Sequence, residues 1–381
     1  MPSHRGLGRR GVVLLAVLLG ALVGWVALAG RRGGGAASGQ GGSAVVSNVL
    51  EHVPADAFLV AEIDVDRLRA TELGRRLLGD GREVAGLGEI QALCGRDPMN
   101  AVRRLVIAVP EADEVGFGLF ADGVAISAEA MLGCAERIVA ERGGKPRRTV
   151  RGRFGLLEDE EASVTSARLA VADGGPLVLG EPPYVDASLR LAEGEGTSLA
   201  GAGQHAELRE RLEGDVVVAT AVLSAEQRAT LRQELRMQNM ADSPFRSVSA
   251  AGLGARVGRD LSLHAVLVCD DATAAQSVAA VIDEARRGEA ETPAAVVSGL
   301  NSVLGRLVVG STGNVVQLRL RLPVDDALQL VQRLLALRRL AQQRPAPIPS
   351  VDPTPAPGSG GARPAVSMER LTPAPAASSA P

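Results

Sequence analysis

The sequence predicts an α+β fold in which antiparallel strand hairpins are each followed by a helix packed on one face of the sheet. Short stretches of alternating apolar and polar residues joined by tight polar turns are typical of antiparallel pairs. Stretches with apolar residues at 3.6-residue spacing follow them, as in amphipathic helices. The alternation is clearest in the strand formed by Val316, Gln317, Leu318, Arg319, Leu320, Arg321 and Leu322.

The elements of the first half follow from these two patterns. A short helix is predicted to end at Pro54, and a strand over 56–63 leads into a helix that carries Leu68 and Leu73. Two hairpins, each followed by a helix, come next: 102–109 and 115–120 with a helix near 128–142, then 164–172 and 176–180 with a helix near 183–192.

The second half repeats this plan. A strand over 215–222 leads into a helix that opens with Ser224 and Gln227 at capping-box spacing. Two further units are predicted: two strands and a helix over 248–287, then strands near 304–310 and 314–322 with a helix over 325–341. Because both halves open in the same way, the sequence predicts two similar modules, 48–213 and 214–341.

The flanking segments differ in composition from the two modules. Residues 1–10 are basic, and residues 11–30 hold an uncharged apolar run. As a helix this run would be about 27 Å long, close to the thickness of a bilayer's hydrocarbon core. Residues 31–47 are a Gly/Ser-rich linker, and residues 342–381 are rich in Pro and Ala, so we expect a disordered tail.

The apolar run predicts the compartment of the body. A single-pass membrane helix over 11–30 would leave the body on the extracytoplasmic side, periplasmic or at the cell surface, because basic residues before the run favour a cytoplasmic N-terminus. The alternative is a signal peptide, since Ala27-Leu28-Ala29 has the small-x-small form of a cleavage site. The body would then be secreted after cleavage near Ala29.

Composition argues against nucleic acid as a partner. The 381-residue chain has 41 basic and 44 acidic residues and a net charge of −3, so no strong positive field would attract a polyanion. Aromatic residues make up 2% of the chain, which leaves few platforms for stacked bases or sugars. We therefore expect no nucleic-acid partner.

The three cysteines allow at most one internal disulfide. An oxidising compartment permits a pair among Cys94, Cys134 and Cys269 but does not require one, so the sequence leaves the pairing open. Cys134 falls on the apolar face of its predicted helix, and Cys269 continues the inward-facing residues of its strand. Both are therefore expected as buried small hydrophobes.

Acidic residues at two strand-to-helix junctions are the first candidates for chemistry. Glu62, Asp64 and Asp66 could hold a divalent metal, but Asp66 acting as a helix N-cap explains the same residues. Asp270 and Asp271 likewise lie where capping carboxylates belong.

The other candidates give no complete site. His4, His52, His205 and His264 are scattered, with His264 predicted on the solvent face of its strand, and no nucleophile accompanies them. Lys145, Arg147, Arg148, Arg151 and Arg153 form a basic cluster, followed by the acidic residues 158–161. On adjacent strands the two groups would neutralise each other; the alternative is contact with an anionic lipid or another polyanion. We predict no catalytic residue, no cofactor and no metal.

Two stretches carry a family resemblance. One is the module opening Val53-Pro54-Ala55-Asp56-Ala57-Phe58, and the other is Gly175-Pro176-Leu177-Val178-Leu179-Gly180 with the helices after it. Over most of residues 50–225 the chain resembles a bacterial family of membrane-anchored extracytoplasmic proteins of unknown function. The resemblance implies a fold and a location, and it brings no catalytic residues.

These patterns together predict a membrane-tethered extracytoplasmic protein that is not an enzyme. It would be a structural or interaction module of the cell envelope, held in the membrane through residues 11–30, with an envelope protein as its partner. The alternative is an exported enzyme or small-ligand carrier whose site is assembled from residues far apart in the sequence.

Overall fold

The structure, a computed structural model, describes residues 49–79, 92–95, 102–111, 117–123, 127–161, 167–201, 203–212, 214, 216–330 and 332–333. Its strands are β1 (Ala57–Asp64), β2 (Arg104–Pro110), β3 (Gly118–Asp122), β4 (Pro146–Arg151), β5 (Phe154–Asp159), β6 (Arg168–Val171), β7 (Leu177–Gly180), β8 (Val217–Val222), β9 (Val248–Val257), β10 (Asp260–Cys269), β11 (Val308–Thr312) and β12 (Val315–Pro323).

The longest helices of the described residues are α9, α5 and α8, with 19, 14 and 13 residues. They are η1 (Val49–His52), α2 (Val65–Ala70), α3 (Glu72–Gly79), α5 (Ala128–Glu141), α6 (Pro182–Ala192), η3 (Leu199–Gly201), α7 (Gly203–Arg211), α8 (Ala225–Met237), η4 (Pro244–Ser247), α9 (Ala272–Ala290), α10 (Pro293–Ser298) and α11 (Leu300–Arg306). After β12, residues 324–330 are helical as well.

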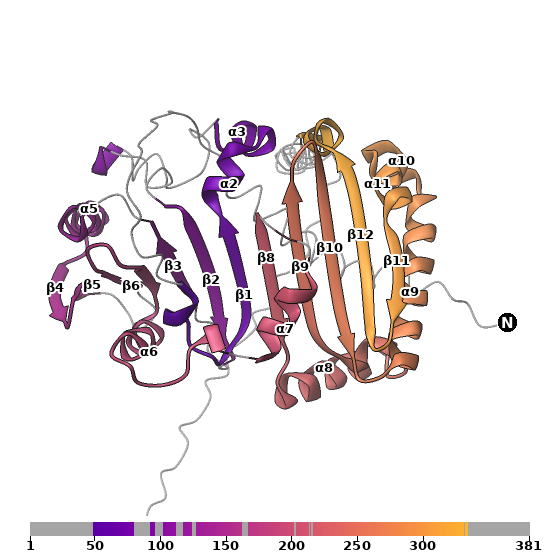
Figure 1. Cartoon of the computed structure of the whole chain (residues 1–381), viewed down its shortest axis with the longest axis horizontal. Coiled ribbons are helices and arrows are strands. Elements are labelled where there is room, and N and C mark those ends of the chain that lie inside the picture. Colours follow the sequence, from indigo (N-terminus) through magenta and orange to yellow (C-terminus); the bar gives the residue numbers. More distant parts are fainter. Residues whose placement is uncertain are drawn as a thin grey trace, which may run out of the picture. The chain divides into compact units, whose positions relative to one another are not determined.

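The described strands form one 12-stranded sheet, in the order β11-β12-β10-β9-β8-β1-β2-β3-β7-β6-β5-β4 (Figure 1). Every neighbouring pair is antiparallel. The predicted α+β class with antiparallel strands is therefore confirmed.

The pair β1–β8 joins the two halves of the sheet. Ile63 lies opposite Val217 and Leu59 opposite Ala221, while β2 and β9 flank the pair on either side. In the first half, β1 is followed by a helical segment and then by β2 and β3, which lie progressively outward in the sheet. In the second half, β8 is followed in the same way by a helical segment and then by β9 and β10. A long helix, α5 or α9, comes next, and a hairpin then returns to pair with the third strand. The hairpin β4–β5 is an addition in the first half, at the sheet edge.

Helices cover both faces of the sheet, which corrects the prediction of a single covered face. We call face A the one that carries Val60 and Phe120, and face B the one that carries Ala61 and Leu119, since side chains alternate along each strand. On face A, Val60 and Phe120 share a core with Tyr184 and Val185 of α6 and with η1. On face B, Leu132 of α5 packs on residues of β5, β6 and β7. Strands β6 and β7 carry apolar residues on both sides, so both sides need a cover there.

The second half is covered in the same two-sided way. Leu208 of α7 and the following Leu212 pack with Val266 on face A, and Val278 and Ile282 of α9 pack with Val316 and Leu318 on face B. The predicted alternation of β12 is confirmed, because its apolar residues are buried while Arg319 and Arg321 are exposed.

His264 is buried, with 6% of its surface exposed, which corrects the prediction that it faces solvent. It lies on β10 two residues before Val266 and therefore on the same face. On this face Leu208 of α7 packs with Val266, whereas Arg319 and Arg321 of the neighbouring strand β12 stay exposed.

Several element boundaries differ from those predicted. The predicted helix after β1 is two helices, because Thr71 interrupts it: its hydroxyl donates to the carbonyl of Leu68 and accepts from the amide of Gly74. The strand predicted from residue 304 begins at Val308 instead, since α11 extends to Arg306. The capping box at Ser224 and Gln227 is confirmed.

The membrane prediction is corrected. In the part of the chain that the structure describes, no helix combines the length and the apolar character needed to cross a bilayer. The structure therefore supplies no support for a single-pass membrane protein. The predicted span 11–30, the basic residues 1–10, the linker 31–47 and the tail 342–381 lie outside the described residues.

A disulfide joins Cys94 to Cys134 of α5, with Cα atoms 5.1 Å apart. Next to it, Arg137 Nε donates to the carbonyl of Leu93 at 3.0 Å, so residues 92–95 are fixed on α5 twice. Cys134 is thus a disulfide partner and not the buried small hydrophobe predicted. Cys269 is free and buried, with 2% exposed, as predicted.

We predict that replacing both bonded cysteines, Cys94→Ser with Cys134→Ser, lowers the free energy of unfolding by about 2–4 kcal/mol. The bond closes a loop of 40 residues, and its loss gives the unfolded chain more conformational entropy. Urea unfolding followed by circular dichroism measures the change. A reductant should destabilise the wild type and leave the double variant unchanged; equal midpoints for wild type and variant would contradict the prediction.

Candidate functional site

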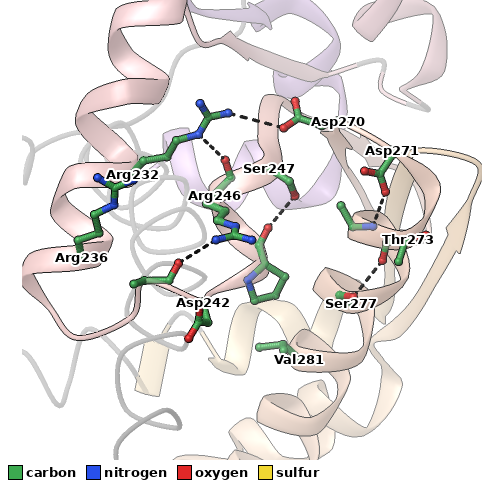
Figure 2. A pocket seen from close by; sticks show the side chains of 13 residues that line it. Arg232, Arg236, Asp242, Arg246, Ser247, Asp270, Asp271, Thr273, Ser277 and Val281 are labelled. Atoms are coloured by element: carbon green, nitrogen blue, oxygen red, sulfur yellow. Dashed lines mark hydrogen bonds and ion pairs between the residues drawn. The ribbon is translucent and has the colours of Figure 1, made fainter.

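A pocket of about 700 Å³ lies between α8, η4 and the start of α9 (Figure 2). Three arginines from α8 and η4 line it, namely Arg232, Arg236 and Arg246, together with the carboxylates of Asp242, Asp270 and Asp271. The remaining lining residues are Ala241, Pro244, Ser247, Thr273, Ala274, Ser277 and Val281.

Local interactions fix the three elements around this pocket. The Asp271 carboxylate accepts a hydrogen bond from the amide of Ala274 at 2.8 Å and so begins α9. Phe245 of η4 packs against the core beneath α9, and Ser247 Oγ donates to the carbonyl of Pro244 at 2.6 Å. Because Asp271 is the N-cap of α9, the capping role predicted for it is confirmed.

The arginines of the pocket differ in how far their donors are used. Asp270 is 3.4 Å from Arg228 and 3.7 Å from Arg232, and Figure 2 shows the second of these contacts. Arg246 donates to the carbonyl of Ala241 at 3.3 Å. Arg236 makes no side-chain hydrogen bond or ion pair with any described residue.

The lining has three arginines and three aspartates, and among these the guanidinium of Arg236 keeps donors that no described residue uses. Guanidinium groups with unused donors recognise carboxylates and phosphates. Ser247 and Ser277 donate to backbone carbonyls, and Asp271 caps its helix, so neither the hydroxyls nor that carboxylate is arranged as a nucleophile with its base. The sequence signal was present: Arg228, Arg232 and Arg236 recur every four residues and share one face of a helix.

The acidic residues at the end of β1 do not converge on a metal. The N-cap of α2 is Asp64, which accepts from the amide of Arg67 at 2.8 Å, and this corrects the prediction of Asp66. Glu62 pairs with Arg104 at 3.4 Å and Asp66 with Arg69 at 3.3 Å. Among the described residues, no group of three or more His, Cys, Asp or Glu could hold a metal ion.

The basic cluster is neutralised on adjacent strands, as one of its two interpretations predicted. Arg147 of β4 pairs with Glu158 of β5, and this hydrogen bond lowers the pKa of the glutamate. Lys145 pairs with Glu161, and Arg151 with Glu193 of the turn after α6 at 2.7 Å. Arg148 bonds to two glutamates of α5, Glu129 and Glu136. Arg153 lies over the ring of Phe154, 5.3 Å from its centre.

His205 connects α7 to the two central strands. Its Nε2 is 3.0 Å from the carbonyl of Ala57 on β1, and because a carbonyl can only accept, Nε2 carries the proton. Nδ1 then accepts from the hydroxyl of Thr220 on β8, at 2.8 Å. Burial lowers the pKa of His205, so the ring is held neutral. Burial also lowers the pKa of His52; His4 lies outside the described residues.

The centre of face B has an apolar area that belongs to none of the core clusters of the described residues. Residues paired across the strands form a middle row of Leu179, Leu119, Ile107, Ala61, Ala219, Leu253, Ala265 and Leu318. The next row is formed by Val109, Leu59, Ala221, Ala251, Leu267 and Val316. At the outer strands these rows pack with α5 or α9.

At the centre of the sheet, the same two rows are half-buried and join none of the buried clusters of the described residues. We call these central residues the open face. They are Leu59, Ala61, Ile107, Val109, Ala219, Ala221, Ala251 and Leu253. Above them, Ile63 and Val217 are buried with Val65 of α2, so the open face ends at that row.

We predict that the protein loses stability as the pH falls below about 6.5, and that His205→Gln reduces this loss. The unfolded histidine takes up a proton below its ordinary pKa, whereas the folded ring, with its lowered pKa, does not. The wild type should therefore lose up to about 1.4 kcal/mol more per pH unit than the variant. Urea unfolding at pH values from about 5 to about 8, which bracket the ordinary pKa of histidine, measures the free energy of unfolding. Parallel plots of this free energy against pH for the wild type and the variant would contradict the prediction.

Comparisons with known proteins add little. No protein-family model matches the chain, and no curated protein matches it. Two chains of solved structures match. One is crystal form I of TP0453, with a TM-score of 0.41 and 12% sequence identity over 77% of this chain and 98% of that chain. A similarity at this level carries no argument about function.

Proposed function

We propose that this protein is a non-catalytic binding protein that works in an oxidising compartment outside the cytosol and receives its ligand or partner on the open face. The observation that carries the proposal is the apolar, half-buried centre of face B. Burying apolar surface stabilises a protein or a complex by about 25 cal/mol per Å², so a ligand that covers this area would gain free energy of binding. An apolar area four strands wide that joins none of the core clusters of the described residues is a candidate binding surface.

The disulfide supports the compartment. Such bonds form and persist in oxidising surroundings and are rare in the cytosol. The bond between Cys94 and Cys134 joins α5 to a segment far from it in sequence, which is a structural use and not that of a reactive pair in a pocket. This agrees with an exported protein and does not depend on a membrane anchor.

The duplicated plan supports the same function. The two halves present the same sequence of elements on either side of the β1–β8 pair, and we propose the two-module arrangement, 48–213 and 214–341, on this ground. Because α5 and α9 occupy equivalent places, they lie on the outer strands of both halves. The strands nearest the junction are left as the shared binding surface.

We predict that the purified protein binds the apolar dye ANS on the open face, and that Ala219→Arg lowers this affinity by about tenfold, since a charge in the middle row is unfavourable beside an apolar ring. Fluorescence titration measures the affinity. The matched control is Val297→Arg on α10, which adds the same charge at an apolar residue that is 84% exposed. Equal binding by both folded variants would refute the proposal.

A second candidate function is the transport of a small anion in the arginine pocket, favoured by the unused donors of Arg236. We predict that titration calorimetry with inorganic phosphate detects binding and that Arg236→Ala weakens it by about tenfold. The control is Arg190→Ala, at an exposed arginine of α6 outside the pocket. Absence of phosphate binding, or the same loss in the control, would exclude this function.

A further inference from the structure

We infer that the free edge of β11 pairs with the β11 of a second copy of this chain, so that two sheets join into one across a two-fold axis. This inference goes beyond the proposed function, because it concerns an edge of the sheet and not its open face. Three observations lead to it: the exposed backbone of β11, the lack of the protection found at the opposite edge, and a strand sequence that fits its own copy.

β11 is the last strand on its side of the sheet, and four of its five residues are exposed (Figure 1). Among the described strands it pairs with β12 alone. The two-residue turn Gly313-Asn314 makes Thr312 and Val315 a hydrogen-bonded pair, and such pairs recur at every second residue. The N–H and C=O groups of Val309 and Ser311 therefore point away from β12, and no backbone group of another described segment bonds to them.

The two ends of the sheet differ in how their edges are protected. At the other end, β4 begins with a proline and has three arginines that are held by glutamates. Prolines and charges of this kind stop strands of other chains from adding to an edge. β11 has the sequence Val-Val-Gly-Ser-Thr, with no proline and no charge, and its Val308 is 64% exposed. An edge in this state is a template to which another strand adds.

The sequence of β11 fits an antiparallel copy of itself. When Gly310 lies opposite the partner's Gly310, Val309 lies opposite the partner's Ser311, and Ser311 lies opposite the partner's Val309. Each of these last two pairs can exchange two backbone hydrogen bonds, because both residues of the pair have outward-pointing groups. The strand has no charged side chain, so the pairing brings no like charges together.

The helix beside this edge is compatible with the pairing. On face B, α9 packs with Val309 of β11 and with Val316 of β12. A two-fold axis perpendicular to the joined sheet places the second α9 on the same face. Because α9 has no charged side chain from Ala272 to Ile282, the two helices bring no like charges together along this stretch.

Pairing of β11 with its own copy also closes the assembly at two chains. The remaining edge of each copy is the protected β4, so the joined sheet keeps no unprotected end. Pairing of β11 with β4 would instead repeat from copy to copy and give an open filament. It would also displace the ion pairs of Arg147 and Arg148. A two-fold dimer is therefore the assembly that this edge favours.

The test is sedimentation equilibrium of the purified full-length protein over a range of concentrations, which should show a reversible monomer–dimer equilibrium. Gly310→Lys should raise the dissociation constant by at least about tenfold, because the dimer places two lysines opposite each other. The monomer tolerates this change, since a Cβ at Gly310 meets no atom within 4 Å. The matched control is Thr149→Lys, which adds the same charge at an exposed residue of β4 and should dimerise like the wild type.

A cysteine on the axis identifies the pairing surface. Opposed residues of a non-hydrogen-bonded antiparallel pair have Cα atoms about 4.5 Å apart, a distance that a disulfide spans. Under mild oxidation Gly310→Cys should therefore form a covalent dimer. The control Val150→Cys, at a residue of β4 that is 79% exposed, should stay monomeric on a denaturing gel.

Three outcomes would overturn the inference. One is a wild type that stays monomeric at every concentration, which would mean that the edge is bare or is paired with a different strand. Another is a dimer that Gly310→Lys and Thr149→Lys weaken equally. The third is a disulfide between Gly310→Cys and Val150→Cys chains without one between two Gly310→Cys chains, which would show head-to-tail pairing of β11 with β4.

Discussion

The antiparallel pairing of β1 with β8 is the interaction on which the rest of the structure depends. Without it the described residues would form two smaller sheets, each with an open central edge. His205 reinforces the junction, because its two ring nitrogens bond to Ala57 on β1 and Thr220 on β8. A single neutral imidazole from α7 thus bridges the strands that connect the halves, and its burial is the reason that it stays neutral.

The same junction determines where the molecule can bind. On face A the central strands are covered by α7 and by the cluster that includes η1 and α6. On face B the long helices follow the third strand of each half and so lie over the outer strands. Joining the halves brings their inner strands together, and on face B no helix of the described residues packs in a core cluster with the centre of these strands. The open face is thus a consequence of the topology, not of one local motif.

The sequence predicted much of the fold because alternation and helical spacing are local properties. The alternation of β12, the capping box at Ser224 and the cap at Asp271 were all readable from neighbouring residues. Some errors are local, such as the N-cap of α2 at Asp64 instead of Asp66. Others involve partners far away in the chain. Val266, which follows His264 on the same face of β10, packs with Leu208 of α7, and the state of Cys134 depends on Cys94. The pocket had one local signal, the arginines of α8 at four-residue spacing, but its three elements meet only in the fold. The open face combines four strands and has no local motif.

The edge strand β4 has a further consequence for the behaviour of the protein in solution. It is the last strand on its side of the sheet, begins with Pro146 and carries Arg147, Arg148 and Arg151. An exposed edge is a template on which a foreign strand can add. Here the arginines are held by glutamates of β5, α5 and the turn after α6, so an incoming chain would have to displace these ion pairs. The charged border thus acts as a guard against aggregation through this end of the sheet.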